Sequence, residues 1–304
     1  VWSLFGIDAE VSAEQLNGIY RSKYRLKEQP LVSVIIPNKD HTEDLDKCIR
    51  SIEEKGTYKN IEYIVIENNS EKKETFAYYE KLQAENPKVK VVFWEREFNY
   101  SAINNYGVGF AKGEYLLFLN NDTEIINPDC IEELLGYCMR DDVGIVGARL
   151  YYEDDTIQHV GVIIGLGGVA GHTFVGEPKD SLGYFGRIVT AQDYSAVTAA
   201  CLMTKRKVFE KVNGFEEKLA VAFNDVDFCL KVREAGYLVV YNPYAELHHY
   251  ESKSRGLEDT EEKVLRFQGE IRTFQYRWKE ILNEGDPYYS PNLTLDKTDF
   301  SLRI

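Results

Sequence analysis

The first half of the chain alternates short apolar runs with longer segments in which apolar residues recur at helical spacing. The apolar runs have the length and composition of buried strands and lie at 31–37, 61–66, 89–94 and 115–119. The segments with helical spacing lie at 40–55, 75–86 and 99–112. Strands that alternate with helices in this way predict βαβ units and a parallel sheet.

The second half continues the alternation less regularly. Helices are predicted at 128–139, 205–212 and 225–235, and strands at 143–150, 198–204 and 238–241. The segment 157–190 is rich in glycine, which predicts short strands and long loops over a cleft. An amphipathic helix at 259–283 and an extended tail at 285–304 follow. Residues 1–30 carry mixed helical spacing and end in a charged run, which predicts a helical lead-in and a linker.

Three of the predicted strands end in polar clusters, at 38–40, 67–69 and 120–122. In a doubly wound parallel sheet these ends share one edge, where ligands bind. Asp122 is well placed there to hold a divalent cation through its oxygens. Asn and Asp also favour turns, so each cluster alone is equally explained as a turn. Their convergence on one edge favours a ligand site.

Composition narrows the classes of protein and partner. The chain of 304 residues has 44% hydrophobic and 28% charged residues, as ordinary globular proteins do. Its formal charge of −14 disfavours nucleic-acid binding and requires local neutralisation of any anionic substrate. The sequence has no run of ~18 apolar residues, so it predicts no membrane span. The five cysteines are scattered, which predicts free thiols in a reducing cytosol. Because the chain starts with valine, we expect a domain of a longer protein.

Several common enzyme motifs are absent from the sequence. The first predicted strand is not followed by GxGxxG, which disfavours dinucleotide binding of the Rossmann type. The chain has no GxxxxGK[ST], the motif of P-loop NTPases, and no GxSxG, the motif of common serine hydrolases.

Two clusters in the second half carry candidate chemistry. Asp225 and Asp227 stand at the start of a predicted helix. They are explained either as cap and first-turn acids, worth ~1 kcal/mol, or as a general base with a supporting carboxylate. His249 precedes Lys253 and Arg255 in a serine-rich stretch. A histidine beside a strand is often structural, but this stretch also suits a pyrophosphate, with His249 as a nitrogen ligand of its cation.

These segments together resemble family-2 glycosyltransferases of the GT-A fold. The nucleotide half of that family is similar to LVSVIIPN (31–38), IVIENNS (64–70), FNYSAINNYG (98–107) and GEYLLFLNNDT (113–123). Its acceptor half is similar to NGFEE (213–217), NDVDFCLKVREAGY (224–237) and HYESKSRG (249–256). The tail at 286–293 is similar to that of bacterial members fused into multi-domain proteins of polysaccharide or adhesin glycosylation.

The resemblance implies an α/β chain with a Rossmann-like, mostly parallel sheet flanked by helices and a C-terminal helical extension. It divides the chain into a lead-in at 1–30, a GT-A domain at 31–258, and a helix and tail at 259–304. Within the GT-A domain, residues 31–123 form the nucleotide-binding half and residues 124–258 the acceptor half.

The resemblance also implies roles for individual residues. Asp225 falls on the catalytic base, and Asp122 and His249 fall on the ligands of Mn²⁺ or Mg²⁺. The residues implied in donor binding are Pro37, Asn38, Asp40, Glu67, Asn68, Asn99, Asn104, Asn121, Lys253 and Arg255. Glu67 and Asn68 would contact the base and Asn121 the ribose. Asn68 replaces a frequent Asp, which leaves a UDP-sugar, the favoured donor, and a dTDP-sugar both open.

The function implied is metal-dependent, inverting transfer of a hexose from a nucleotide-diphosphate sugar to a hydroxyl of a glycan or glycoprotein. A catalytically silent sugar- or partner-binding module and a sugar nucleotidyltransferase are the alternatives. We expect a cytoplasmic location, which includes the inner face of the cell membrane, and no nucleic-acid partner. Whether the chain forms a homo-oligomer is left open.

Overall fold

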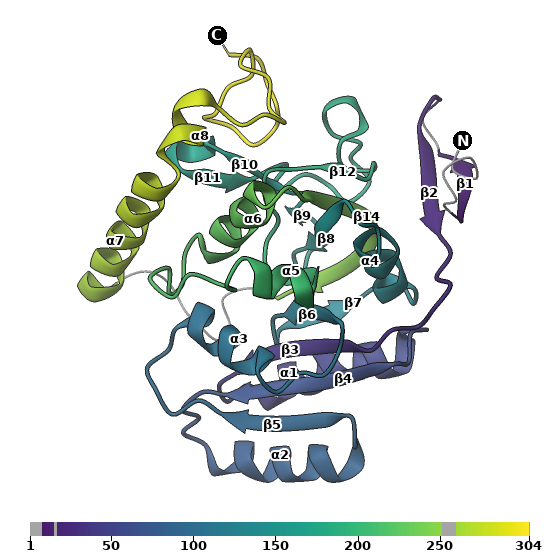
Figure 1. The fold of residues 1–304 in the computed structure, drawn as a ribbon, viewed down its shortest axis with the longest axis vertical. Coiled ribbons are helices and arrows are strands. Elements are labelled where there is room, and N and C mark those ends of the chain that lie inside the picture. Colours follow the sequence, from purple (N-terminus) through teal and green to yellow (C-terminus); the bar gives the residue numbers. More distant parts are fainter. Residues whose placement is uncertain (1–7, 15–16, 251–259, 304) are drawn as a thin grey trace.

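A mixed sheet of ten strands runs through the molecule, and helices cover both of its faces (Figure 1). The computed structural model describes residues 8–14, 17–250 and 260–303. The central strand order is β12-β14-β8-β13-β6-β3-β4-β5, with β7 paired to β14 and β9 paired to β8. No helix within the described residues is long and apolar enough to cross a membrane.

The first half of the sheet is parallel, as the alternating pattern predicts. Its strands are β3 (Val32–Asn38), β4 (Ile61–Glu67), β5 (Val89–Phe93) and β6 (Tyr115–Leu119). The helices between them are α1 (Thr42–Arg50), which continues into a π-helical turn η2 (Ser51–Lys55), α2 (Lys73–Glu85) and α3 (Tyr100–Val108). Alternate residues of β6 enter different cores: Phe118 packs in one hydrophobic cluster and Leu117 in the other. Burial on both faces explains why this strand is apolar throughout.

The second half joins the same sheet in mixed orientation. Its strands are β7 (Thr123–Ile125), β8 (Val143–Tyr151), β9 (Ile157–His159), β12 (Gln192–Asp193), β13 (Cys201–Lys205) and β14 (Leu238–His249). Its helices are α4 (Cys130–Cys138), α5 (Arg206–Lys211) and α6 (Asn224–Glu234). Strand β13 lies between β6 and β8 and runs antiparallel to both, so it joins the two halves of the sheet. The apolar pattern does not predict this change of strand direction.

Strand β14 is longer than predicted. The sequence predicts a strand that ends before Pro243, but the strand runs on from Leu238 to His249. Its register against β8 shifts between Asn242 and Glu246. Pro243 lies inside this irregularity, where its missing N–H removes no ladder hydrogen bond.

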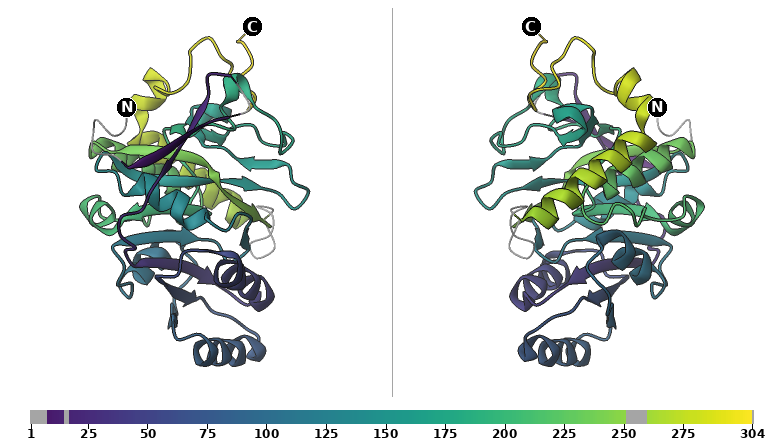
Figure 2. Two further views of the ribbon diagram at one scale, coloured as in Figure 1. Left: turned by 90° about the vertical axis from the view of Figure 1, so that its right-hand side faces the viewer. Right: turned by 90° about the vertical axis from the view of Figure 1, so that its left-hand side faces the viewer.

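The glycine-rich segment forms short elements, as predicted. They are β10 (Val162–Ile164), β11 (Ala170–His172), and the 3₁₀ turns η3 (Leu166–Gly168) and η4 (Tyr184–Gly186). The C-terminal segment forms α7 (Glu261–Arg277) and α8 (Lys279–Glu284), followed by an irregular tail. Helix α7 lies along the flank of the second half, beside α6 (Figures 1 and 2).

The predicted helical lead-in is wrong for the residues that the structure describes. They form an antiparallel hairpin of β1 (Ala9–Ala13) and β2 (Tyr20–Tyr24). Gly18 between the strands has a φ of 88°, a conformation that glycine adopts at little cost and that suits a turn. In β2, Arg21 and Lys23 both reach α4, an alternation of period two that the mixed helical spacing concealed.

Candidate functional site

Asp122 and His249, the two predicted metal ligands, lie against each other at the edge of the sheet. His249 ends β14 and pairs with Thr123, the first residue of β7, so this strand pairing places it beside Asp122. Asp122 Oδ1 lies 3.2 Å from His249 Nε2, and the two side chains are only 7% and 9% exposed. The extension of β14 past Pro243 therefore creates the contact.

The surroundings of His249 fit a metal ligand. Its Nδ1 lies 2.7 Å from Oε1 of Gln158, whose Nε2 donates to the His249 backbone oxygen at 3.2 Å. Because an amide oxygen only accepts, Nδ1 donates to Gln158, and Nε2 faces both Asp122 Oδ1 at 3.2 Å and the side-chain amide of Asn120 at 3.1 Å. Such a partner on the second nitrogen is common in metal-binding histidines. Sequence reasoning missed Gln158, since only the fold brings the glycine-rich segment beside β14.

The separation of the two atoms also fits a cation. Adjacent ligands of an octahedral ion with bonds of ~2.1 Å stand ~3 Å apart, close to the 3.2 Å between Asp122 Oδ1 and His249 Nε2. Among the described residues no group of three His, Cys, Asp or Glu could hold a metal. The described residues thus offer a pair of ligands, and a cation held by them would keep positions for phosphate oxygens and water.

The ends of β3 and β6 lie side by side and bond to one another. Asn121 Nδ2 donates to Asn38 Oδ1 at 2.6 Å, and Asn38 Nδ2 donates to the Asp40 backbone oxygen and to the Tyr79 hydroxyl at 2.8 and 2.7 Å. The Asp40 carboxylate accepts from the backbone N–H groups of residues 71 and 72. Three predicted donor-binding residues are thereby assembled in one network.

Glu67 and Asn68, the predicted contacts of the base, are almost fully buried. The Glu67 carboxylate accepts from the backbone N–H of Ser70 at 2.5 Å and from the Tyr79 hydroxyl at 2.7 Å. Asn68 Nδ2 donates to the backbone oxygens of residues 94 and 96. The two side chains are therefore packed into the protein at the end of β4 and do not project from it.

Two further predicted donor-binding residues lie on α3. Asn99 caps this helix, because its side chain accepts from Ala102 N at 2.9 Å, and it also donates to the Glu217 backbone oxygen at 2.8 Å. Asn104 is fully buried and donates to the Tyr100 backbone oxygen one turn earlier. The structure therefore does not bring the Asn104 side chain to the surface of the site.

Three predicted residues remain. Pro37 lies in β3, where it pairs with Ile66 of β4 and is partly buried. Lys253 and Arg255, the predicted cations of a pyrophosphate loop, lie outside the described residues.

One turn, at Ala199 and Ala200, connects Asp225, the predicted base, to the end of β6. Its Oδ2 accepts from Ala199 N at 3.1 Å, while the oxygen of the next residue, Ala200, accepts from Asn120 N at 3.1 Å. The turn thus contacts Asp225 on one side and the strand end that carries Asp122 on the other. Asp225 Oδ1 accepts from the backbone N–H of the next residue at 2.8 Å, and Asp225 as a whole is partly exposed.

Tyr100 lies between the two acidic residues and was missed by sequence reasoning. Its hydroxyl donates to the Ala199 backbone oxygen at 3.1 Å, and its backbone N–H donates to Ala220 O at 2.7 Å. Burial raises the pKa of its hydroxyl, and the carboxylates of Asp225 and Asp122 raise this pKa further. The phenol therefore stays protonated next to both acids. Its place beside the predicted helix cap is the signal that could have found it.

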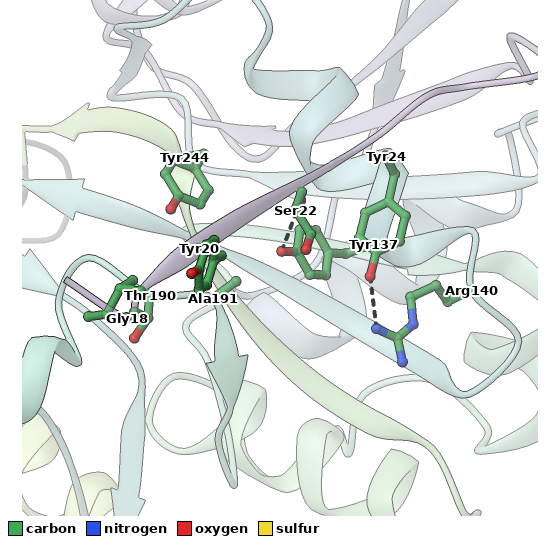
Figure 3. A pocket seen from close by; sticks show the side chains of 10 residues that line it. Gly18, Tyr20, Ser22, Tyr24, Tyr137, Arg140, Thr190, Ala191 and Tyr244 are labelled. Atoms are coloured by element: carbon green, nitrogen blue, oxygen red, sulfur yellow. Dashed lines mark hydrogen bonds between the residues drawn. The ribbon is translucent and has the colours of Figure 1, made fainter. Parts of the chain in front are cut away.

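A cavity of about 390 Å³ lies elsewhere, between the N-terminal hairpin and the body of the protein (Figure 3). Tyr20 and Tyr24 of the hairpin, Tyr137 and Arg140 next to them, and Tyr244 of β14 line it. None of the predicted site residues that the structure describes takes part in its lining. The candidate site at the sheet edge is therefore separate from this cavity.

Comparison with known proteins identifies the family of the chain. Residues 33–212 match the family model described as glycosyl transferase family 2. The chain is 47% identical over 284 residues to the uncharacterized protein y4gI of Sinorhizobium fredii, covering 93% of this chain and 31% of that protein. It is 37% identical over 286 residues to the O-antigen biosynthesis protein RfbC of Myxococcus xanthus, covering 93% and 22%. The chain thus spans less than a third of the length of either relative.

Solved structures share the fold. The mannosyltransferase PcManGT of Pyrobaculum calidifontis, in complex with GDP-Man and Mn²⁺, aligns over 81% of this chain and 65% of its own, with a TM-score of 0.58 and 16% identity. GalNAc-T7 with UDP, GalNAc and Mn²⁺ aligns over 86% and 50%, with a TM-score of 0.67 and 15% identity. These likenesses confirm the predicted GT-A fold.

Proposed function

Because the chain belongs to glycosyl transferase family 2, we propose that it transfers a hexose from a nucleotide-diphosphate sugar to an acceptor hydroxyl, with inversion at the anomeric carbon. One observation carries the proposal. The turn at Ala199 and Ala200 bonds to Asp225 on one side and to the strand end with Asp122 and His249 on the other. A candidate base and a candidate cation site are thus held on one rigid frame.

The two sides have complementary tasks in the proposed reaction. Asp225 accepts the proton of the acceptor hydroxyl as the oxygen attacks the anomeric carbon. A base on the acceptor side is what a single in-line displacement needs, and such a displacement inverts the configuration. Asp122 and His249 would hold Mn²⁺ or Mg²⁺, which supplies positive charge to the departing diphosphate. Tyr100 keeps the turn between the two sides in place through its bond to Ala199.

The proposed donor is a UDP-sugar or a dTDP-sugar. Asn38, Asp40 and Asn121 form the polar network at the strand edge where the nucleoside would lie. The two structural neighbours were solved with nucleotides and Mn²⁺, which supports a nucleotide-sugar donor and a divalent cation. Roles for Glu67, Asn68, Asn99, Asn104, Pro37, Lys253 and Arg255 in donor binding stay predictions.

The proposed acceptor is a cell-surface glycan or a glycoprotein. The relationship to a protein named for O-antigen biosynthesis supports a polysaccharide. A cytoplasmic reaction, in solution or at the inner face of the membrane, suits the five cysteines, which are all buried and free.

A donor screen tests the proposed function. The protein is incubated with UDP-Glc, UDP-Gal, UDP-GlcNAc and dTDP-rhamnose in Mn²⁺, and the released nucleotide is measured. We expect release of the nucleoside diphosphate from one donor, and its loss when EDTA removes the metal. Conversion of a donor into a nucleoside triphosphate and a sugar 1-phosphate, only when pyrophosphate is added, would instead indicate a nucleotidyltransferase. Nucleotide binding with no turnover of any donor would indicate a silent binding module.

A further inference from the structure

The segment 216–223, here called the base loop, leads directly into α6 and Asp225. One side of the base loop is bonded to the start of α3. Its backbone oxygens at Leu219 and Ala220 accept from the Ser101 hydroxyl and from Tyr100 N, both at 2.7 Å. The position of the candidate base therefore depends on how this loop is held.

The other side of the base loop is held by a carboxylate of α7. Glu270 Oε1 accepts from Val221 N at 2.8 Å and Glu270 Oε2 accepts from Ala222 N at 3.2 Å. Glu270 is only 3% exposed. A buried carboxylate is costly unless it is hydrogen-bonded, and here each oxygen meets one backbone N–H. Those N–H groups lie three and four residues before Asp225.

Helix α7 and Trp278, the residue after it, contact the junction of the base loop and α6 at two further points. Phe223, which precedes α6 with a φ of 61°, packs its ring against Phe267 and Phe274, with centroids 5.9 and 5.3 Å away. Trp278 donates its Nε1–H to Asp227 Oδ1 at 2.9 Å. Contacts from the C-terminal segment thus lie on both sides of Asp225 along the chain.

We propose that Glu270 is a positioning residue for Asp225: by fixing the N–H groups of the base loop, it sets where the Asp225 carboxylate stands. The inference rests on the proposed function and adds a residue of α7, which lies beyond the 33–212 matched by the family model. Apolar packing alone would dock α7. The paired hydrogen bonds instead fix the backbone of a loop whose last residue already has a left-handed conformation.

The first test is Glu270→Gln, which keeps the size of the side chain but leaves one N–H of the loop facing an amide N–H. Since small misplacements of catalytic groups cost up to ~100-fold in rate, we expect kcat to fall by about 10-fold to 100-fold. The affinity for the donor should change little, and the variant should stay folded at the assay temperature although its melting temperature falls. The matched control is Glu262→Gln, an exposed carboxylate of the same helix, which should keep the wild-type kcat.

A double-mutant cycle separates positioning from a general loss of structure. If Glu270 acts through Asp225, Glu270→Gln should have no further effect on the residual rate of Asp225→Asn. Trp278→Phe, which removes the N–H donated to Asp227 and reduces the size of the ring, gives a second readout of the same kind if Glu270→Gln does not fold. A kcat within twofold of wild type, or an equal loss with and without Asp225, would overturn the inference. Absence of transfer by the wild-type protein would refute the proposed function instead.

Discussion

Asp225 and Asp227 stand two residues apart on α6, and their surroundings give them different tasks. Asp227 is fully buried, where its carboxylate meets Trp278 Nε1 at 2.9 Å and Arg277 Nε at 3.1 Å. Burial raises the pKa of Asp227, although Lys231, Trp278 and Arg277 oppose the rise. Asp225 is partly exposed and touches the turn at the sheet edge. Asp225, the partly exposed acid, is the candidate base. Asp227, the buried acid, anchors the start of α6 through its contacts with Trp278 and Arg277.

The ion pairs of Glu124, beside the candidate site, can be tested through the pH dependence of stability. Lys47 and Lys55 lie 2.8 and 2.6 Å from its carboxylate, and the Tyr250 hydroxyl donates to it. Burial raises its pKa, but these partners prevail and lower the pKa from 4.5 to about 2. Because the folded pKa is depressed, the stabilisation is present above pH 4.5 and is lost as the pH falls toward 2.

We therefore expect the free energy of unfolding of the wild type to fall in that window by about 1–2 kcal/mol more than that of Glu124→Gln, allowing for solvent screening. Urea unfolding of both proteins at several pH values measures this difference. Parallel pH profiles for the two proteins would show that the ion pairs contribute nothing.

At the scale of elements, the N-terminal hairpin is an integral part of the fold. Gly136 of α4 lies so close to β2 that a Cβ there would be 2.9 Å from the Tyr24 Cβ. The Tyr24 ring meets the Tyr137 ring edge-on at 4.8 Å. Arg21 Nη2 donates to the buried Glu133 carboxylate at 2.6 Å. The hairpin therefore supplies the cation that pairs with a buried acid of α4.

We expect Arg21→Ala to destabilise the protein by about 1–3 kcal/mol, because it leaves the nearly buried Glu133 carboxylate without its closest cation. The matched control is Arg25→Ala in the same hairpin region. Arg25 pairs with Glu10 at 3.8 Å, and both side chains are about two-thirds exposed. Exposed pairs contribute little, so this change should cost less than about 0.5 kcal/mol. Equal losses in urea unfolding would refute an anchoring role for Arg21.

At the scale of the whole molecule, the candidate site combines residues from both halves of the sheet, and this explains what the sequence could and could not predict. The local alternation of strands and helices predicted the parallel strands and their polar ends. The contact of Asp122 with His249 depends on β14 pairing with β7 after the irregularity at Pro243, which no local pattern encodes. Likewise Glu67 is buried by its hydrogen bonds to Tyr79 and Ser70, which the strand pattern does not predict. The sequence predicts a helix where the hairpin lies, because apolar spacing in short segments fits both periods.

The central claim is that Asp225 is the base of a glycosyl transfer, and steady-state kinetics of Asp225→Asn test it most directly. The amide keeps the shape of the side chain and cannot accept the proton. With the donor and the metal identified in the screen, we expect kcat to fall by about 10²-fold to 10⁴-fold. The dissociation constant of the donor, measured by calorimetry in Mn²⁺, should stay within about twofold of the wild-type value, because Asp225 lies on the acceptor side. Transfer at the wild-type rate by Asp225→Asn would contradict the account.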